Sequence, residues 1–142
     1  MPEASENRLL DIAQVCEKAA AAIDERGWCQ DYLEDTEGRV CALGGIQVAV
    51  YGHTNEATVW RASPLYPELT DDEQMAHDTM VALIGTVWGE DLPENHRGYA
   101  VFGNEDPGLI TTMWNDQAGR VIEDVTGALR DTAARLYKEA SK

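Results

Sequence analysis

The stretch RGWCQDYLEDTEGRVCALGG, residues 26–45, separates two segments with helical apolar spacing, and it decides how the first half of the chain folds. Cys29 and Cys41 stand on either side of its acidic centre. The sequence DTEGR within it is typical of a turn, where Gly38 supplies a positive φ if the turn type requires one. We interpret the stretch as a corner between two helices, and its cysteines raise the question of whether it is a site or a structural element.

The segment before the corner, residues 6–26, has the spacing of an amphipathic helix. Its apolar residues recur every three or four positions and line one face. These residues are Leu9, Ile12, Ala13, Cys16, Ala19, Ala20 and Ile23. Arg26 followed by Gly27 is a typical helix end, with a cation in the last turn and a glycine cap.

Three more helices are predicted after the corner, over residues 41–51, 71–88 and 120–138. The first keeps helical spacing although the pair Gly44-Gly45 costs about 2 kcal/mol of helix propensity relative to alanines. The second begins with a capping box, Thr70 and Glu73. The third has an apolar stripe that starts at Val121. Residues 52–69 and 89–108 are predicted to be irregular.

The predicted fold class is therefore mainly α. We expect a single compact helical domain over residues 1–142, with an ordered core of about residues 6–138 and four to five helices joined by long irregular connections. A chain of 142 residues is long enough to bury a sizeable core without a disulfide or a metal.

The net charge of −15 is the strongest global feature, because 26 carboxylates face only 11 lysines and arginines. Such a field repels phosphate backbones and anionic lipid surfaces, so we predict no direct binding of nucleic acid. Acidity for solubility alone is the ordinary explanation, and a basic partner is the other. The candidate acidic interaction face consists of Asp31, Glu34, Asp35, Glu37, Asp71, Asp72, Glu73, Glu90 and Asp91.

The composition also bears on location and on metals. The start MPEASENRLL lacks the basic and apolar regions of a secretory signal, and no apolar run approaches the ~20 residues that span a membrane. Three cysteines without a dense framework are typical of free thiols in a reducing cytoplasm. His53, His77 and His96 are scattered, so neither a metal site nor a cofactor is predicted.

Three motifs carry a resemblance to a known family. They are GWCQ at residues 27–30, GRVCALGGI at residues 38–46 and WND at residues 114–116. In this order the chain resembles a family of small actinobacterial and actinobacteriophage proteins of unknown function, from Leu9 to about Leu136. The resemblance implies an actinobacterial or phage origin and a helical fold, and it implies no activity. The chain departs from the family in Gly45, where alanine is usual, and in Val121, near where a Ser or Thr would cap the last helix.

Cys29 and Cys41 admit several interpretations. The favoured one is structural, with both thiols packed as small hydrophobes beside Trp28. Half of a zinc site, a catalytic thiol with an unseen base, and redox or disulfide chemistry between the pair are the alternatives. We expect both thiols to be shielded from solvent.

The motif WND leaves a similar choice between packing and a site. Asn115 and Asp116 can hydrogen-bond free backbone amides, and Trp114 can fill the space beside Trp28. Alternatively the polar motif residues line a pocket. The candidate pocket or motif residues are Trp28, Cys29, Gln30, Arg39, Cys41, Trp114, Asn115 and Asp116.

Two functions are kept open on this basis. The first is a non-catalytic protein-interaction module of the cytoplasm, of actinobacterial or phage origin, which binds a host protein through its acidic face; self-association is compatible with it. The second is a small enzyme or ligand-binding protein with a pocket between GWCQ and WND. A pocket that holds both Cys29 and a histidine would favour the second.

Overall fold

The computed structural model describes residues 6–55, 69–87 and 107–142. Within these ranges the chain is mainly helical, as predicted, and contains five helices and only isolated β-bridges. The helices are α1 (Glu6–Arg26), α2 (Ala42–Tyr51), α4 (Asp71–Val87), α6 (Pro107–Asn115) and α7 (Ile122–Ala140).

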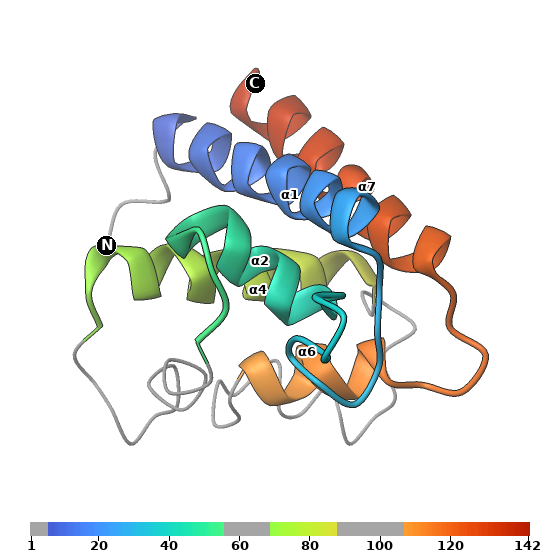
Figure 1. Cartoon of the computed structure of the whole chain (residues 1–142). Coiled ribbons are helices and arrows are strands. Elements are labelled where there is room, and N and C mark those ends of the chain that lie inside the picture. The colour runs from blue at the N-terminus through green and yellow to red at the C-terminus, as the bar shows by residue number, and fades with distance from the viewer. Residues whose placement is uncertain (1–5, 56–68, 88–106) are drawn as a thin grey trace.

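The helices stack in three levels (Figure 1). The two longest, α1 and α7, run antiparallel side by side. Helices α2 and α4 lie beneath this pair and contact each other, and α6 lies below them, against both. The corner between α1 and α2 loops down to the C-terminal end of α6, so a segment near residue 30 meets one near residue 115.

The core sits between the α1/α7 pair and the second level. On α1 the buried positions are mostly small, including Ala13, Cys16, Ala19 and Ala20, so the backbones of neighbouring helices approach closely. Larger side chains fill the remaining space from the other helices, among them Ile46, Leu83, Val125, Leu129 and Leu136. A fully buried aliphatic side chain of this kind stabilises the fold by about 1.5–3 kcal/mol.

Most predicted boundaries lie within two residues of the observed ones. The prediction for residues 6–26 matches α1, and α2 begins one residue late because Cys41 is its N-cap. At α4 the capping box is confirmed: the amide of Glu73 donates to Thr70 Oγ1 at 3.1 Å, and the Thr70 amide donates to Glu73 Oε1 at 2.9 Å. Residue 88, the predicted end of this helix, lies outside the described residues.

Helix α6 was not predicted, and it corrects the assignment of residues 107–108 to an irregular segment. Its first residue is Pro107, whose missing amide hydrogen and fixed φ suit the first position of a helix. Its buried residues include Ile110 and Trp114, which share one helical face.

Val121 also corrects the predicted stripe of the last helix. It is 47% exposed and stands outside the helix as the N-cap of α7, in extended conformation. Valine has no acceptor for the free amides of the first turn. Only the reciprocal half of a capping box is formed, in which the Val121 amide donates to Asp124 Oδ2 at 3.0 Å.

We therefore predict that Val121→Thr stabilises the protein, by about 1 kcal/mol, because threonine adds the missing side-chain acceptor at an N-cap. Urea unfolding followed by circular dichroism measures the change. The matched control is Val81→Thr, which makes the same substitution at a 49% exposed site inside α4, where no cap exists. Equal effects at both positions would show that the cap of α7 is not the cause.

In the part of the chain that the structure describes, none of the helices combines the length and apolar character needed to cross a bilayer.

Candidate functional site

The corner, residues 27–41, begins with a glycine that its geometry requires. Gly27 follows the last turn of α1 with φ +94°, and its amide donates to Ile23 O at 2.8 Å. A Cβ atom there would lie 2.9 Å from Arg39 Cγ. Glycine is needed on both counts, because other residues rarely adopt this φ and the returning chain leaves no room for a side chain.

Val40 is the centre of the corner's backbone pairing. It forms a parallel bridge with Trp28 on one side and an antiparallel bridge with Glu34 on the other. The Cys29 amide donates to Val40 O and the Val40 amide donates to Gly27 O, both at 3.1 Å. These bonds fold the corner back on itself before α2 begins.

Asn115, at the end of α6, joins the corner to the rest of the protein. Its side chain is fully buried, and Oδ1 accepts from Trp28 Nε1 at 2.7 Å and from the Ala42 amide at 2.9 Å. Its Nδ2 donates to Cys29 O at 3.1 Å and to Asp116 Oδ1 at 2.9 Å. One amide group therefore binds the start of the corner and the first residue of α2.

A second set of bonds fastens the loop after Cys29. Gln30 Nε2 donates to the carbonyls of Asn115 and Gln117, each at 3.0 Å. The Asp31 amide donates to Asp116 Oδ1 at 3.0 Å, and Asp31 itself has φ +72°. This conformation is uncommon outside glycine but is tolerated by Asp.

The acidic turn is held by Asp35. Its Oδ1 accepts from the amides of Glu37 and Arg39, at 3.0 and 2.9 Å, and its Oδ2 pairs with Arg39 Nε at 2.6 Å. Partial burial acts to raise the pKa of Asp35, but the hydrogen bonds and charge of Arg39 outweigh it and lower the pKa. Arg39 also contacts Glu37, with 3.4 Å between Nη2 and Oε2.

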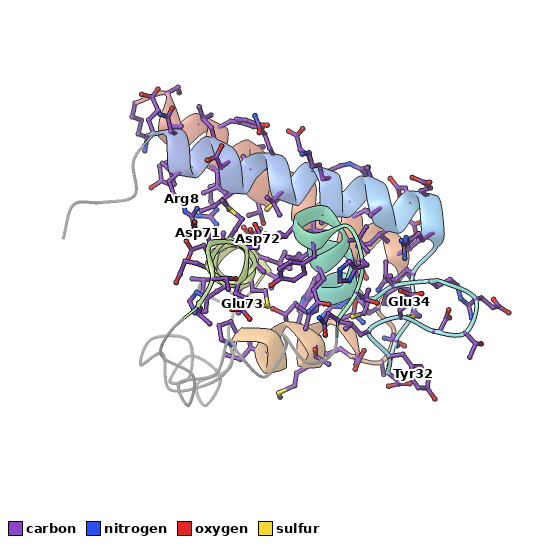
Figure 2. The ribbon with its side chains drawn as sticks, turned by 60° about the vertical axis from the view of Figure 1, so that its left-hand side comes forward. Arg8, Tyr32, Glu34, Asp71, Asp72 and Glu73 are labelled. Atoms are coloured by element: carbon purple, nitrogen blue, oxygen red, sulfur yellow. The ribbon has the colours of Figure 1, made fainter. Side chains whose placement is uncertain are left out.

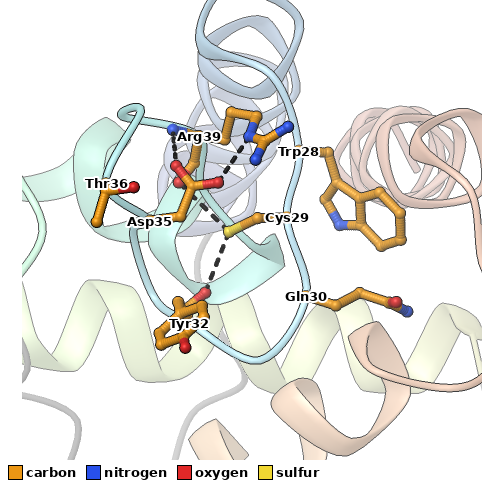
Figure 3. A pocket seen from close by; sticks show the side chains of 7 residues that line it. All are labelled: Trp28, Cys29, Gln30, Tyr32, Asp35, Thr36 and Arg39. Atoms are coloured by element: carbon orange, nitrogen blue, oxygen red, sulfur yellow. Dashed lines mark hydrogen bonds and ion pairs between the residues drawn. The ribbon is translucent and has the colours of Figure 1, made fainter.

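An open hollow of about 410 Å³ lies on the outer side of this corner (Figure 3). The residues that line it are Trp28, Cys29, Gln30, Tyr32, Asp35, Thr36 and Arg39. Tyr32 stands at its edge with 65% of its surface exposed. Cys29 points toward Tyr32 in the view, and its thiol lies 3.3 Å from each of the carbonyls of Tyr32 and Arg39.

Cys29 and Cys41 are shielded, as predicted, with 8% and 3% of their surfaces exposed. Cys41 Sγ accepts a hydrogen bond from the Gly44 amide at 3.3 Å, which makes the thiol the side-chain cap of α2. Burial raises the pKa of Cys29 to about 11 and that of Cys41 to about 12. At neutral pH both are protonated thiols, which are poor nucleophiles.

These pKa shifts predict that the protein loses stability in alkali. An unfolded thiol ionises near 9.0, whereas the folded ones hold their protons up to about 11 and 12. Above pH 9.0, each thiol therefore lowers the free energy of unfolding by up to about 1.4 kcal/mol per pH unit, until its folded pKa is reached. Urea midpoints should fall across this range, and less steeply in a Cys29→Ala/Cys41→Ala variant. Parallel declines in both proteins would contradict the shifts.

The structure brings part of the predicted pocket together. Trp28, Cys29, Gln30 and Arg39 line the hollow. Asn115 and Asp116 lie behind them as supports. Cys41 is buried as a cap.

Trp114 does not line the hollow either; it is buried, with 4% of its surface exposed. The guanidinium of Arg120 covers its ring, 4.5 Å from the centroid, and Arg120 Nε donates to Trp114 O at 3.1 Å. This hollow therefore lies on the GWCQ side of the corner, and none of its described lining residues belongs to WND.

Two lining residues, Tyr32 and Thr36, were not among the predicted site residues. No periodicity marks them, since both lie in an irregular loop. An aromatic residue inside a strongly acidic turn was the one available signal for Tyr32, because such a turn offers no core for the ring.

The candidate acidic face is divided in space. Figure 2 shows Asp71 and Asp72 at the opposite side of the view from Tyr32 and Glu34. Glu73 is 6% exposed and belongs to the capping box, so it is not a surface group. In the corner, Glu34 pairs with Arg26, with 3.4 Å between Oε1 and Nη1. Glu90 and Asp91 lie outside the described residues.

Among the described residues no three His, Cys, Asp or Glu side chains are grouped so that they could hold a metal ion.

Comparison with known proteins places the chain in a family. No curated protein and no solved structure matches the chain significantly. A family model described as "Family of unknown function (DUF6197)" matches residues 7–135, a range that runs from the second residue of α1 into α7 and includes α2, α4 and α6. The chain therefore belongs to this family of unknown function, DUF6197.

Proposed function

We propose that this protein is a non-catalytic protein-interaction module whose binding surface is the outer side of the corner. The observation that carries the proposal is Tyr32, a large aromatic side chain that is 65% exposed beside an open hollow. Exposed tyrosines are typical anchors of protein interfaces, because one end of the ring is apolar and the other forms hydrogen bonds.

The backbone around Tyr32 is fastened on both sides, which favours recognition over a loop that merely connects helices. Before it, Gln30 and Asp31 are bonded to residues 115–117. After it, Asp35 closes the turn onto Arg39. A surface that is ordered before binding loses less conformational entropy when a partner docks.

The chemistry of the hollow supports binding more than catalysis. Its thiol, Cys29, is protonated at neutral pH, since burial raises its pKa to about 11. Its carboxylate, Asp35, is committed to Arg39 and to two backbone amides. Among its described lining residues there is no histidine that could act as a base for the thiol.

Charge indicates the kind of partner. Asp31 and Glu37 flank Tyr32 on the exposed loop, within a chain of net charge −15. A basic surface of a host protein in the bacterial or phage-infected cytoplasm is the expected partner. Mimicry of nucleic acid requires one continuous stripe of carboxylates, and the separation of Asp71 and Asp72 from the corner does not support it.

A pull-down from an actinobacterial lysate tests the proposal. The immobilised proteins are the wild type, Tyr32→Ala and the control Val81→Ala, which truncates a 49% exposed side chain on α4. The wild type and the control should capture the same protein. Tyr32→Ala should recover at least about tenfold less of it. Added salt should release it. Undiminished capture by Tyr32→Ala would refute the proposed surface.

The hollow itself favours a second candidate, a small-molecule binding protein. Its volume suits a small ligand, and Trp28 and Arg39 offer stacking and charge. A thermal-shift screen of metabolites tests this function. A ligand of the hollow should stabilise the wild type but not Thr36→Trp, in which a large side chain occupies the space. Equal stabilisation of both proteins would place the ligand elsewhere.

A further inference from the structure

Cys29 and Cys41 are neighbours in register across a parallel β-bridge. The bridge joins Trp28 to Val40, and each cysteine is the next residue on its own bridged segment. Side chains that follow a bridged pair in parallel strands point to the same face, on backbones about 4.8 Å apart. The two thiols therefore lie side by side although the chain between them loops out and returns.

This spacing falls within the range for a disulfide, whose Cα atoms are usually about 4.4–6.8 Å apart. The two sulfurs also interact electrostatically. Burial is the main cause that raises the pKa of Cys41, and the charge of an ionised Cys29 raises it further. All three cysteines are free in the structure, and Cys16 belongs to the buried face of α1.

We infer that Cys29 and Cys41 form a redox-sensitive pair, which a low-molecular-weight disulfide such as oxidised glutathione converts into an intramolecular disulfide. The inference goes beyond the proposed binding role and does not depend on it.

The reaction takes two exchanges. In the first, the Cys29 thiol loses its proton, and its sulfur attacks one sulfur of glutathione disulfide and releases one glutathione thiolate. In the second, the deprotonated sulfur of Cys41 attacks Cys29 Sγ and releases the second glutathione. The protein loses two hydrogens and gains one S–S bond, and the glutathione disulfide is reduced to two thiols.

The order of attack follows from access. Cys29 lines the open hollow, whereas Cys41 is not among the lining residues and is 3% exposed, and Cys16 is fully buried. The incoming disulfide therefore reaches Cys29 first. The reacting species is the thiolate, and Cys29 is protonated at neutral pH. Oxidation should therefore be slow at neutral pH, and its rate should rise about tenfold per pH unit.

Oxidation changes the corner from inside. In the reduced state, Cys41 Sγ caps the Gly44 amide, and the Cys29 thiol contacts the carbonyls of Tyr32 and Arg39. A disulfide turns both sulfurs toward each other and removes these contacts. The floor of the hollow and the first turn of α2 would thus differ between the two redox states.

The test is incubation of the full-length reduced protein with oxidised glutathione, followed by intact mass and peptide mapping. The wild type should lose two hydrogens, retain no glutathione and yield linked peptides of Cys29 and Cys41, with Cys16 still reduced. Cys41→Ala should retain one glutathione on Cys29, because the resolving thiol is gone. Cys16→Ala, the control, should behave as the wild type.

Three results would overturn the inference. They are a stable glutathione adduct on Cys29 in the wild type, a cross-link that contains Cys16, and a wild type that stays fully reduced at a pH where unfolded protein is oxidised. Each would show that Cys29 and Cys41 do not form the inferred disulfide in the folded chain. None of them bears on capture of a partner through Tyr32, so the binding role is judged separately.

Discussion

Asn115→Ala is expected to lower the free energy of unfolding by about 3–4 kcal/mol, because buried polar groups that lose their partners each cost about 1–3 kcal/mol. The groups affected are the Trp28 indole N–H, the Ala42 amide and the Cys29 carbonyl. Through these bonds the Asn115 side chain joins the end of α6 to the corner and to the first residue of α2. Urea unfolding followed by tryptophan fluorescence and by circular dichroism measures the loss.

Two further variants show whether the loss comes from these bonds. Gln117→Ala alters an exposed neighbour of Asn115 and should stay within about 0.5 kcal/mol of the wild type. Trp28→Phe removes a single bond to Asn115, and its effect should be non-additive with Asn115→Ala in a double-mutant cycle. Full additivity, or an Asn115→Ala variant as stable as the wild type, would refute the role of Asn115.

Gly44→Ala should lower the free energy of unfolding by a similar amount. A Cβ atom at residue 44 would lie 2.2 Å from Leu33 O and 3.0 Å from Val40 Cβ. The first of these is a backbone atom, so relief requires α2 to move away from the corner. We expect a loss of about 3 kcal/mol or more, at the upper end of overpacking effects.

Other glycines of the chain provide graded controls. At Gly45 the nearest atoms belong to the Ile23 side chain, at 2.9 Å, with Ala19 O at 3.2 Å, so Gly45→Ala should cost less than Gly44→Ala. Gly127 lies inside α7 with nothing within 4 Å of a Cβ, and Gly127→Ala should stabilise by about 1 kcal/mol. If Gly44→Ala does not fold, the other two variants still test whether close packing decides the effect. Gly45→Ala should lower the free energy of unfolding, and Gly127→Ala should raise it. Stabilisation at residue 45 would contradict it.

The helices were predictable where the apolar pattern is long and the ends carry ordinary signals. For α1, the spacing of seven apolar residues on one face indicated the extent of the helix, and the pair Arg26-Gly27 indicated its end. For α4, Thr70 and Glu73 marked the start. Helix α6 was missed because its pattern is short, although a proline at its first position was an available signal.

The reason for Gly44 and Gly45 was not predictable from local sequence. Helix propensity alone predicts that these two glycines destabilise α2 by about 2 kcal/mol relative to alanines. Only the fold shows that a side chain at residue 44 would collide with the backbone of the corner. The start of α7 was misplaced for a related reason, since apolar periodicity cannot distinguish an exposed N-cap such as Val121 from a core residue.

The candidate site was predictable as a set of residues but not as an arrangement. The motif GWCQ lines the hollow, whereas Asn115 and Asp116 support it from behind. The difference lies in which way each side chain points within an irregular loop, and that depends on hydrogen bonds between residues more than 80 positions apart.

We propose that the corner serves as a structural element with a binding surface and not as a catalytic site. Native-state alkylation with iodoacetamide at neutral pH tests it most directly, with each thiol's rate compared with that in denaturant. Raising the pKa of Cys29 from 9.0 to about 11 reduces its thiolate about a hundredfold, and burial slows access further. We therefore predict that Cys29 and Cys41 react at least about a hundredfold more slowly in the folded protein. Rapid alkylation of one of them, at the rate of the unfolded chain, would contradict the claim and favour an enzyme.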